Sequence, residues 1–143
     1  MQNVVNALMV KIYVLVILCI IFNVTSPAFI SHAEQHEIEA SSLLNRKAIH
    51  FYKVGDYSKA LSYAQQALII VQKKSGRKAT IDRIDILNNT ALIQEAIGNY
   101  KDAELALNKV LDAIEKTFGA NSVKAATSLS SLGRIYKFQG RYE

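Results

Sequence analysis

The pattern nearest to a metal site in this sequence is a pair of histidines, His32 and His36, with Glu34 between them. Two histidines four residues apart share one face of a helix and can bind zinc there, but the His-Glu-x-x-His motif needs the glutamate directly after the first histidine. Glu34 stands one position too late. We therefore expect no metal and no cofactor.

Other residues that could do chemistry have simpler explanations. The carboxylate pairs Asp82/Asp85 and Asp102/Glu104 fall near expected helix starts, where the helix dipole favours acidic side chains. The sequence has no Gly-rich phosphate loop and no Gly-x-Ser-x-Gly or Ser-x-x-Lys motif. Its single cysteine, Cys19, lies in an apolar run. We expect no catalytic residue, and thus no enzyme in this chain alone.

Residues 1–33 have the order of a secretory signal peptide. Lys11 precedes an unbroken apolar run over 12–22, and small residues at Ser31 and Ala33 fit a signal peptidase site. The run is short for a membrane span, which needs roughly 20 apolar residues. We expect cleavage after Ala33.

The expected product is residues 34–143, long enough for one small domain and exported, either secreted or periplasmic. The alternative is a membrane anchor over 12–30, and membrane contact is expected only if that segment stays uncleaved. Sixteen basic and twelve acidic residues are interspersed along the product. Solvated helix faces explain such a pattern, so we expect no nucleic-acid binding.

A three-residue motif recurs through the rest of the chain. It occurs as Gly55-Asp56-Tyr57, Gly98-Asn99-Tyr100 and Gly140-Arg141-Tyr142, at steps of 43 and 42 residues. Two further positions keep the same phase: Leu44, Leu87 and Leu129 at one, and the small residues Ala48, Ala91 and Gly133 at the other. A fixed period of this length is typical of repeat proteins, in which each unit packs against its neighbours.

Apolar residues at three- and four-residue steps predict five helices, over 35–53, 57–74, 81–97, 100–117 and 122–138. Proline is absent after Pro27, and the repeated glycines end helices. We expect Thr80 to cap the third helix, with Asp82 in its first turn. Asn121 or Ser122 is the expected cap of the fifth.

The segment LNRKAIHFYKVGDYSKALSYAQQAL, from Leu44 to Leu68, resembles a tetratricopeptide repeat. The resemblance implies an all-α fold: antiparallel helix pairs stacked as a short right-handed superhelical solenoid of about two and a half units. The units lie near 41–76, 84–119 and, in part, 126–143. The second unit departs from the pattern, with Gln94 where an aromatic residue belongs. The period, longer than the usual unit of about 34 residues, is similar to the subclass found in kinesin light chains.

The resemblance also implies a function, because the first helices of such units line a concave groove that holds a protein or peptide segment. The expected groove residues are Asn45, Arg46, Ile49, Tyr52, Asn88, Asn89, Leu92, Glu95, Ser130, Ser131, Arg134 and Lys137. Asn45 and Asn88 resemble asparagines that clamp a ligand backbone, although either can simply be solvated. Three basic residues against Glu95 predict an acidic segment as the partner.

Two other functions stay open at this point. The chain ends before the second helix of its third unit, so it can be the N-terminal repeat module of a longer protein with a catalytic or signalling domain. The uncapped helix over 122–138 also exposes apolar surface, which favours self-association.

Overall fold

The computed structural model describes residues 11, 13–14, 17 and 27–141. Two compact units are present, Met1–His36 and Glu37–Glu143. In the first unit the described residues are helical, and most of the predicted signal peptide lies outside them. No helix among the described residues combines the length and the hydropathy that crossing a bilayer requires.

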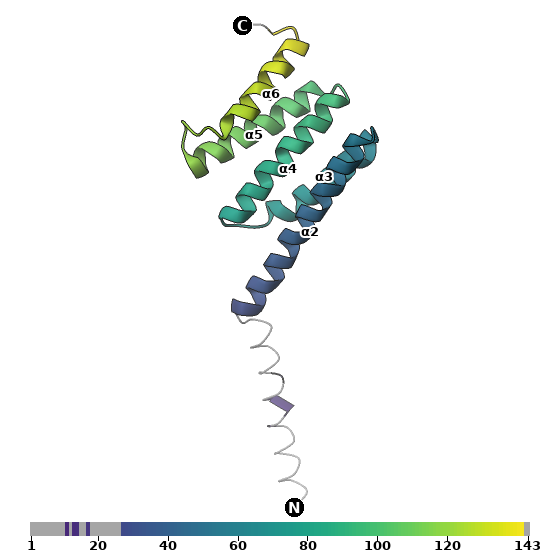
Figure 1. Ribbon diagram of the computed structural model, residues 1–143. Helices are drawn as coiled ribbons and strands as arrows, with labels where there is room; N and C mark the ends of the chain where they lie inside the picture. Colours follow the sequence, from purple (N-terminus) through teal and green to yellow (C-terminus); the bar gives the residue numbers. More distant parts are fainter. Residues whose placement is uncertain (1–10, 12, 15–16, 18–26, 142–143) are drawn as a thin grey trace, which may run out of the picture. The chain divides into compact units, whose positions relative to one another are not determined.

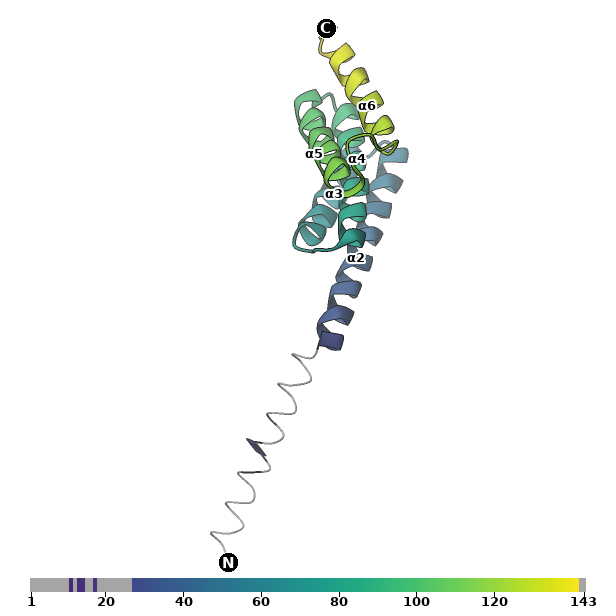
Figure 2. The ribbon, with the colours of Figure 1, turned by 90° about the vertical axis from the view of Figure 1, so that its left-hand side faces the viewer.

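Regular structure in the described residues is entirely α-helical, which confirms the predicted fold class. The helices with defined bounds are α2 (Pro27–Lys53), α3 (Tyr57–Gln72), α4 (Arg77–Ala96), α5 (Tyr100–Phe118) and α6 (Ala125–Phe138). Within the second unit, consecutive helices are antiparallel (Figure 1). Figure 2 shows α3 and α5 on the opposite side of this unit from α2 and α6. The arrangement is a stack of helix pairs.

The three repeated glycines form the same turn at the ends of α2, α4 and α6. Gly55, Gly98 and Gly140 have φ of +81°, +85° and +72°. In each turn the residue after the glycine donates its N–H to a carbonyl five residues earlier, as Asp56 does to Phe51 at 2.9 Å and Asn99 to Gln94 at 2.8 Å. Only glycine reaches such φ values without steric cost, so the repeated motif is a local stop signal.

The predicted starts of three helices are wrong. Helix α2 begins at Pro27, eight residues before the predicted 35, because proline is tolerated in the first turn of a helix. The third helix begins at Arg77 with Gly76 at its N-cap, because Gly76 already breaks the chain at φ +93° and ψ 166°. Thr80 therefore lies inside α4, where its hydroxyl donates to the Gly76 carbonyl at 3.0 Å, and Asp82 is not in the first turn. Likewise α6 begins at Ala125 behind Lys124, and neither Asn121 nor Ser122 occupies the cap position.

Small residues allow the helices to approach one another. Ala48 of α2, Ala60 and Ala64 of α3, and Ile93 of α4 form one fully buried cluster. A second cluster joins the same three helices, and a third joins α4, α5 and α6 around Leu107. Each helix thus buries apolar residues against its neighbours in the stack.

The third unit differs from the first two at equivalent positions. Leu87 of α4 is 5 % exposed, whereas its equivalent in α6, Leu129, is 54 % exposed. A Cβ added at Gly133 would meet no atom within 4 Å, although the equivalent Ala91 is buried. Within residues 27–141 no helix covers this face of α6, so the small residue has no close neighbour there.

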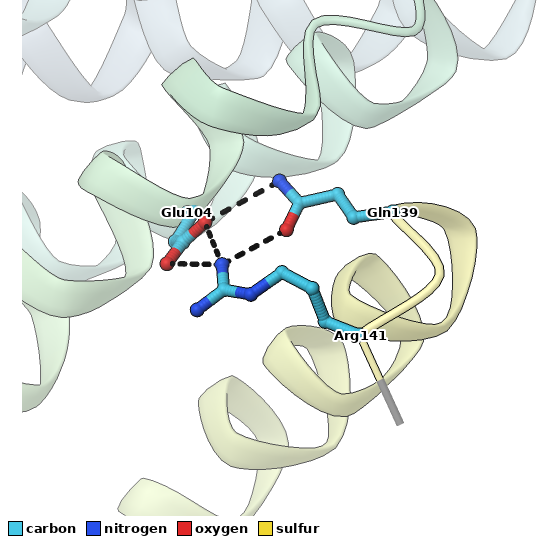
Figure 3. Close-up of polar contacts among 3 residues, drawn as sticks. All are labelled: Glu104, Gln139 and Arg141. Atoms are coloured by element: carbon cyan, nitrogen blue, oxygen red, sulfur yellow. Dashed lines mark hydrogen bonds and ion pairs between the residues drawn. The ribbon is translucent and has the colours of Figure 1, made fainter. Parts of the chain in front are cut away.

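The turn after α6 is fixed to α5 by polar contacts. Arg141 Nη1 donates to both carboxylate oxygens of Glu104, at 3.1 and 3.0 Å, and Gln139 Nε2 donates to the same carboxylate at 3.3 Å (Figure 3). Arg141 also lies over the Tyr136 ring, 4.3 Å from its centroid. These contacts hold the end of α6 in place where no following helix of the described chain does so.

Candidate partner-binding groove

One face of α4 presents a row of residues at helical spacing toward α6. The row is Ile81, Asp85, Asn88, Leu92 and Glu95, and each member lines a cavity that α6 or the loop before it also lines. Residues at these steps share one face of a helix. We call the resulting depression the α4–α6 groove.

Three adjoining cavities make up the α4–α6 groove. The first, of about 320 Å³, lies between Asp85 and Lys124, and the second, of about 140 Å³, between Asn88 and Ser131. The third, of about 460 Å³, lies between Leu92 of α4 and Arg134 and Phe138 of α6. Neighbouring cavities share residues of α4, so the groove is continuous along that helix.

Helix α5 supplies apolar side chains to all three cavities. Ile114 and Phe118 line the first, Leu107 the second and Tyr100 the third. The Tyr100 ring is stacked on that of Phe138, with centroids 5.4 Å apart and planes within 10°. Tyr52 of α2 adds a third aromatic ring to the last cavity. This end of the groove therefore offers apolar surface to a partner side chain.

Amide and hydroxyl groups connect the first helices of neighbouring units. Asn89 Nδ2 of α4 donates to Asn45 Oδ1 of α2 at 3.0 Å. The buried Ser128 of α6 donates its hydroxyl to Asn88 Oδ1, also at 3.0 Å. The two asparagines that sequence reasoning named as ligand clamps thus already accept hydrogen bonds from the next helix. Only their Nδ2 groups could then donate hydrogen bonds to a ligand.

An ion pair between α4 and α6 lines the third cavity. Arg134 of α6 donates through Nε and Nη2 to the two carboxylate oxygens of Glu95 on α4, with a distance of 2.8 Å for Nη2. This hydrogen bonding raises the pKa of Arg134 above its usual value. The bidentate pair crosses the groove. Glu95 therefore neutralises the positive charge of Arg134, which the sequence analysis expected to bind an acidic partner.

The first cavity also combines one acidic and one basic side chain. Burial raises the pKa of the Asp85 carboxyl, and neighbouring Asp82 adds to that rise, whereas Lys124 opposes it. Asp85 and Lys124 line the same cavity. With Glu95 and Arg134 paired at the other end, the groove holds no large excess of either charge.

The structure brings together part of the predicted groove set. Tyr52, Leu92, Glu95 and Arg134 line the third cavity, and Asn88, Asn89, Leu92, Glu95 and Ser131 line the second. The other members lie outside these two cavities: Asn45 is half-buried beneath Asn89, Ile49 is half-buried, and Arg46, Ser130 and Lys137 are exposed.

Sequence reasoning missed three pairs of residues that line the groove. Ile81 and Asp85 continue the Asn88–Leu92–Glu95 row toward the start of α4, so helical spacing alone could have found them. Lys124 and Thr127, and the aromatic pair Tyr100 and Phe138, come from loops and helix ends whose approach depends on packing. Within the described residues, no three His, Cys, Asp or Glu side chains gather as a metal site would require.

Comparisons with known proteins agree with this architecture. The tetratricopeptide repeat family matches residues 39–116 and, in a second match, 82–143. Photosystem I assembly protein Ycf3 of Prochlorococcus marinus (strain NATL1A) is 33% identical over 99 residues, which are 69% of this chain and 49% of that relative. The chain thus spans about half the length of the curated relative it matches. Together with the stacked helix pairs, these matches show that the chain belongs to the tetratricopeptide repeat family.

Proposed function

We propose that this protein is an interaction scaffold that holds an extended segment of a partner protein in the α4–α6 groove. The observation that carries the proposal is the row of three adjoining cavities along α4, apolar at one end and lined by amide and hydroxyl groups in the middle. An extended chain offers backbone N–H and C=O groups along its length, and amide side chains can bind both.

The family supports this proposal, because stacked helical repeats create extended binding surfaces. The relative named as an assembly protein supports a scaffold role rather than catalysis. We further propose that residues 1–33 export the chain, and that the long period places it in the kinesin-light-chain-like subclass. The alternative is that the chain serves as the repeat module of a longer protein that carries a separate activity.

A photo-crosslinking residue tests the groove directly. Placed at Ser131, which lines the second cavity, it should capture a partner, whereas the same residue at the exposed Leu105 of α5 should not. Equal capture from both positions would contradict the groove proposal. Export has its own test: the exported chain should begin at Glu34, and a mature N-terminus at Met1 would reject cleavage.

Once the captured partner is purified, its affinity for an Asn88 variant tests whether Asn88 binds the ligand or only supports the fold. Asn88→Ala should weaken partner binding by roughly tenfold, because a buried hydrogen bond at an interface contributes about 0.5–1.5 kcal/mol and its unmade partner costs more. Ser128→Ala removes only the bond between α6 and Asn88 and should leave the affinity near that of the native chain. Asn108→Ala, on the exposed face of α5, is the matched control. Equal loss in Asn88→Ala and Ser128→Ala would mean that Asn88 only positions α6.

A further inference from the structure

A second depression lies on another face of α4, between α3 and α5. It has a volume of about 390 Å³ and is separate from the α4–α6 groove, since α4 presents Arg83 and Leu87 to it instead of Asp85 and Asn88. Helix α5 lines its other side with Lys109, Asp112 and Lys116. We call it the α3–α5 hollow.

Arg83 is a fixed part of this hollow. Its Nη2 donates to two carbonyls at the end of α3, those of Val71 at 3.1 Å and Lys74 at 2.9 Å. The Val71 carbonyl also accepts the backbone N–H of Lys74 at 3.1 Å, so Arg83 adds a side-chain contact to the turn that ends α3 as well as lining the hollow. Carbonyls carry no formal charge, and the positive charge of Arg83 is therefore not neutralised by these bonds.

The two lysines of the hollow are also without a neutralising partner. Within residues 27–141, neither Lys109 nor Lys116 forms an ion pair, and both are exposed. Three cations thus line one hollow against the single carboxylate of Asp112. The α4–α6 groove differs, because Glu95 pairs with Arg134 there and Asp85 opposes Lys124.

The lining chemistry favours carboxylates over nucleic acid. The lining of this hollow includes no aromatic ring on which a base could stack. Separate lysines suit single carboxylates on side chains, each of which a lysine binds as a point charge. Thr80 and Thr117 add hydroxyl groups to the same lining.

We infer that the α3–α5 hollow binds an acidic polypeptide segment through its Asp and Glu side chains, independently of the α4–α6 groove. The acidic partner that the sequence predicts would then lie on the face formed by the second helices. Lys109 and Lys116 bind its carboxylates, and Asp112 limits the affinity.

A labelled oligoglutamate peptide, titrated against the full chain at low ionic strength by fluorescence anisotropy, tests this inference. Replacing both lysines, Lys109→Gln and Lys116→Gln, should weaken binding about tenfold or more, since it removes the two charges that bind the carboxylates of the peptide. Asp112→Asn should tighten binding by about threefold, because it removes a like charge. Lys101→Gln, on the same helix but outside the hollow, is the control and should change nothing. Binding should vanish at about 1 M salt, where the Debye length is about 3 Å.

Three outcomes would overturn the inference. One is an equal effect of Lys101→Gln and of the double lysine variant. Another is a loss of oligoglutamate binding when Arg134 is replaced, which would show that the acidic segment binds in the α4–α6 groove. The third is binding of a single-stranded oligonucleotide with the same lysine dependence and equal affinity, which would show a general polyanion surface. Circular dichroism should show the same helix content in all variants, since the exchanged side chains are exposed.

Discussion

Arg134 of α6 and Glu95 of α4 form a bidentate ion pair across 39 positions of sequence. The Glu95 side chain is 13 % exposed, and that of Arg134 is 45 % exposed. The pair therefore joins two neighbouring units at the rim of the α4–α6 groove. It gives Arg134 a structural partner in the chain itself, where the sequence suggested a free cation for a ligand.

Arg134→Ala should destabilise the chain by roughly 1–3 kcal/mol, because it leaves the mostly buried Glu95 carboxylate without its partner. Urea unfolding followed by circular dichroism measures this. The cost should fall in a Glu95→Gln background, where no charge is left unpaired. Arg46→Ala, at an exposed position, should stay within about 0.5 kcal/mol. Equal costs of Arg134→Ala in both backgrounds would show that the pair contributes nothing.

Substitution of glycine by alanine should have opposite effects on stability at Gly98 and at Gly133. Gly98→Ala should cost about 1–2 kcal/mol, because alanine at φ +85° meets steric strain. Gly133→Ala should instead stabilise by about 0.5–1 kcal/mol, since Gly133 lies within α6, and a Cβ there has open space. Thermal unfolding of the two variants distinguishes them. A loss of stability in Gly133→Ala would mean that an unseen neighbour covers this face of α6.

Ala48→Leu and Ala91→Leu should each destabilise by roughly 1–3 kcal/mol, because both alanines are fully or almost fully buried between helices and added methyl groups would force the helices apart. Denaturant midpoints give the comparison. Ala126→Leu, at an exposed position of α6, adds the same atoms without crowding and should change stability little. Equal midpoints for buried and exposed substitutions would mean that the helix contacts are wrongly assigned.

Stability should depend on pH through Glu104. The hydrogen bond from Arg141 is the main cause that lowers the pKa of the Glu104 carboxyl. A carboxyl with a lowered folded-state pKa stabilises the fold above its unfolded pKa of about 4.3, and this contribution is lost as the pH falls through the folded-state pKa. Glu104→Gln should therefore be less stable than the native chain at pH near 7, by up to about 1 kcal/mol. The difference should disappear in acid.

Urea unfolding across the acidic range measures this difference. Glu115→Gln, an exposed carboxyl of the same helix, should track the native chain at every pH. A Glu104→Gln difference that is constant with pH would exclude ionisation of Glu104 as its cause.

Much of the fold followed from local sequence signals. The period, the helix-pair architecture and the approximate C-terminal ends of α2 to α6 were predicted correctly, because a glycine at positive φ and an apolar stripe act within a few residues of themselves. The starts of α2, α4 and α6 were less accurate. Thr80 is a good cap residue, yet α4 begins four residues before its predicted start, behind Gly76, and a propensity does not show which of two nearby signals operates.

The sequence by itself determined which residues repeat and which face of each helix they share, since both depend on chain spacing alone. Only the tertiary structure decided what those residues meet. Leu129 has the same phase as Leu87 but is exposed, because no helix of the described chain packs on it. Asn45 meets Asn89 and Glu95 meets Arg134 because the stacking of the units sets the distance between helices. Lys109 and Lys116 gather with Arg83 for the same reason, and contacts between distant parts of the chain leave no trace in local periodicity.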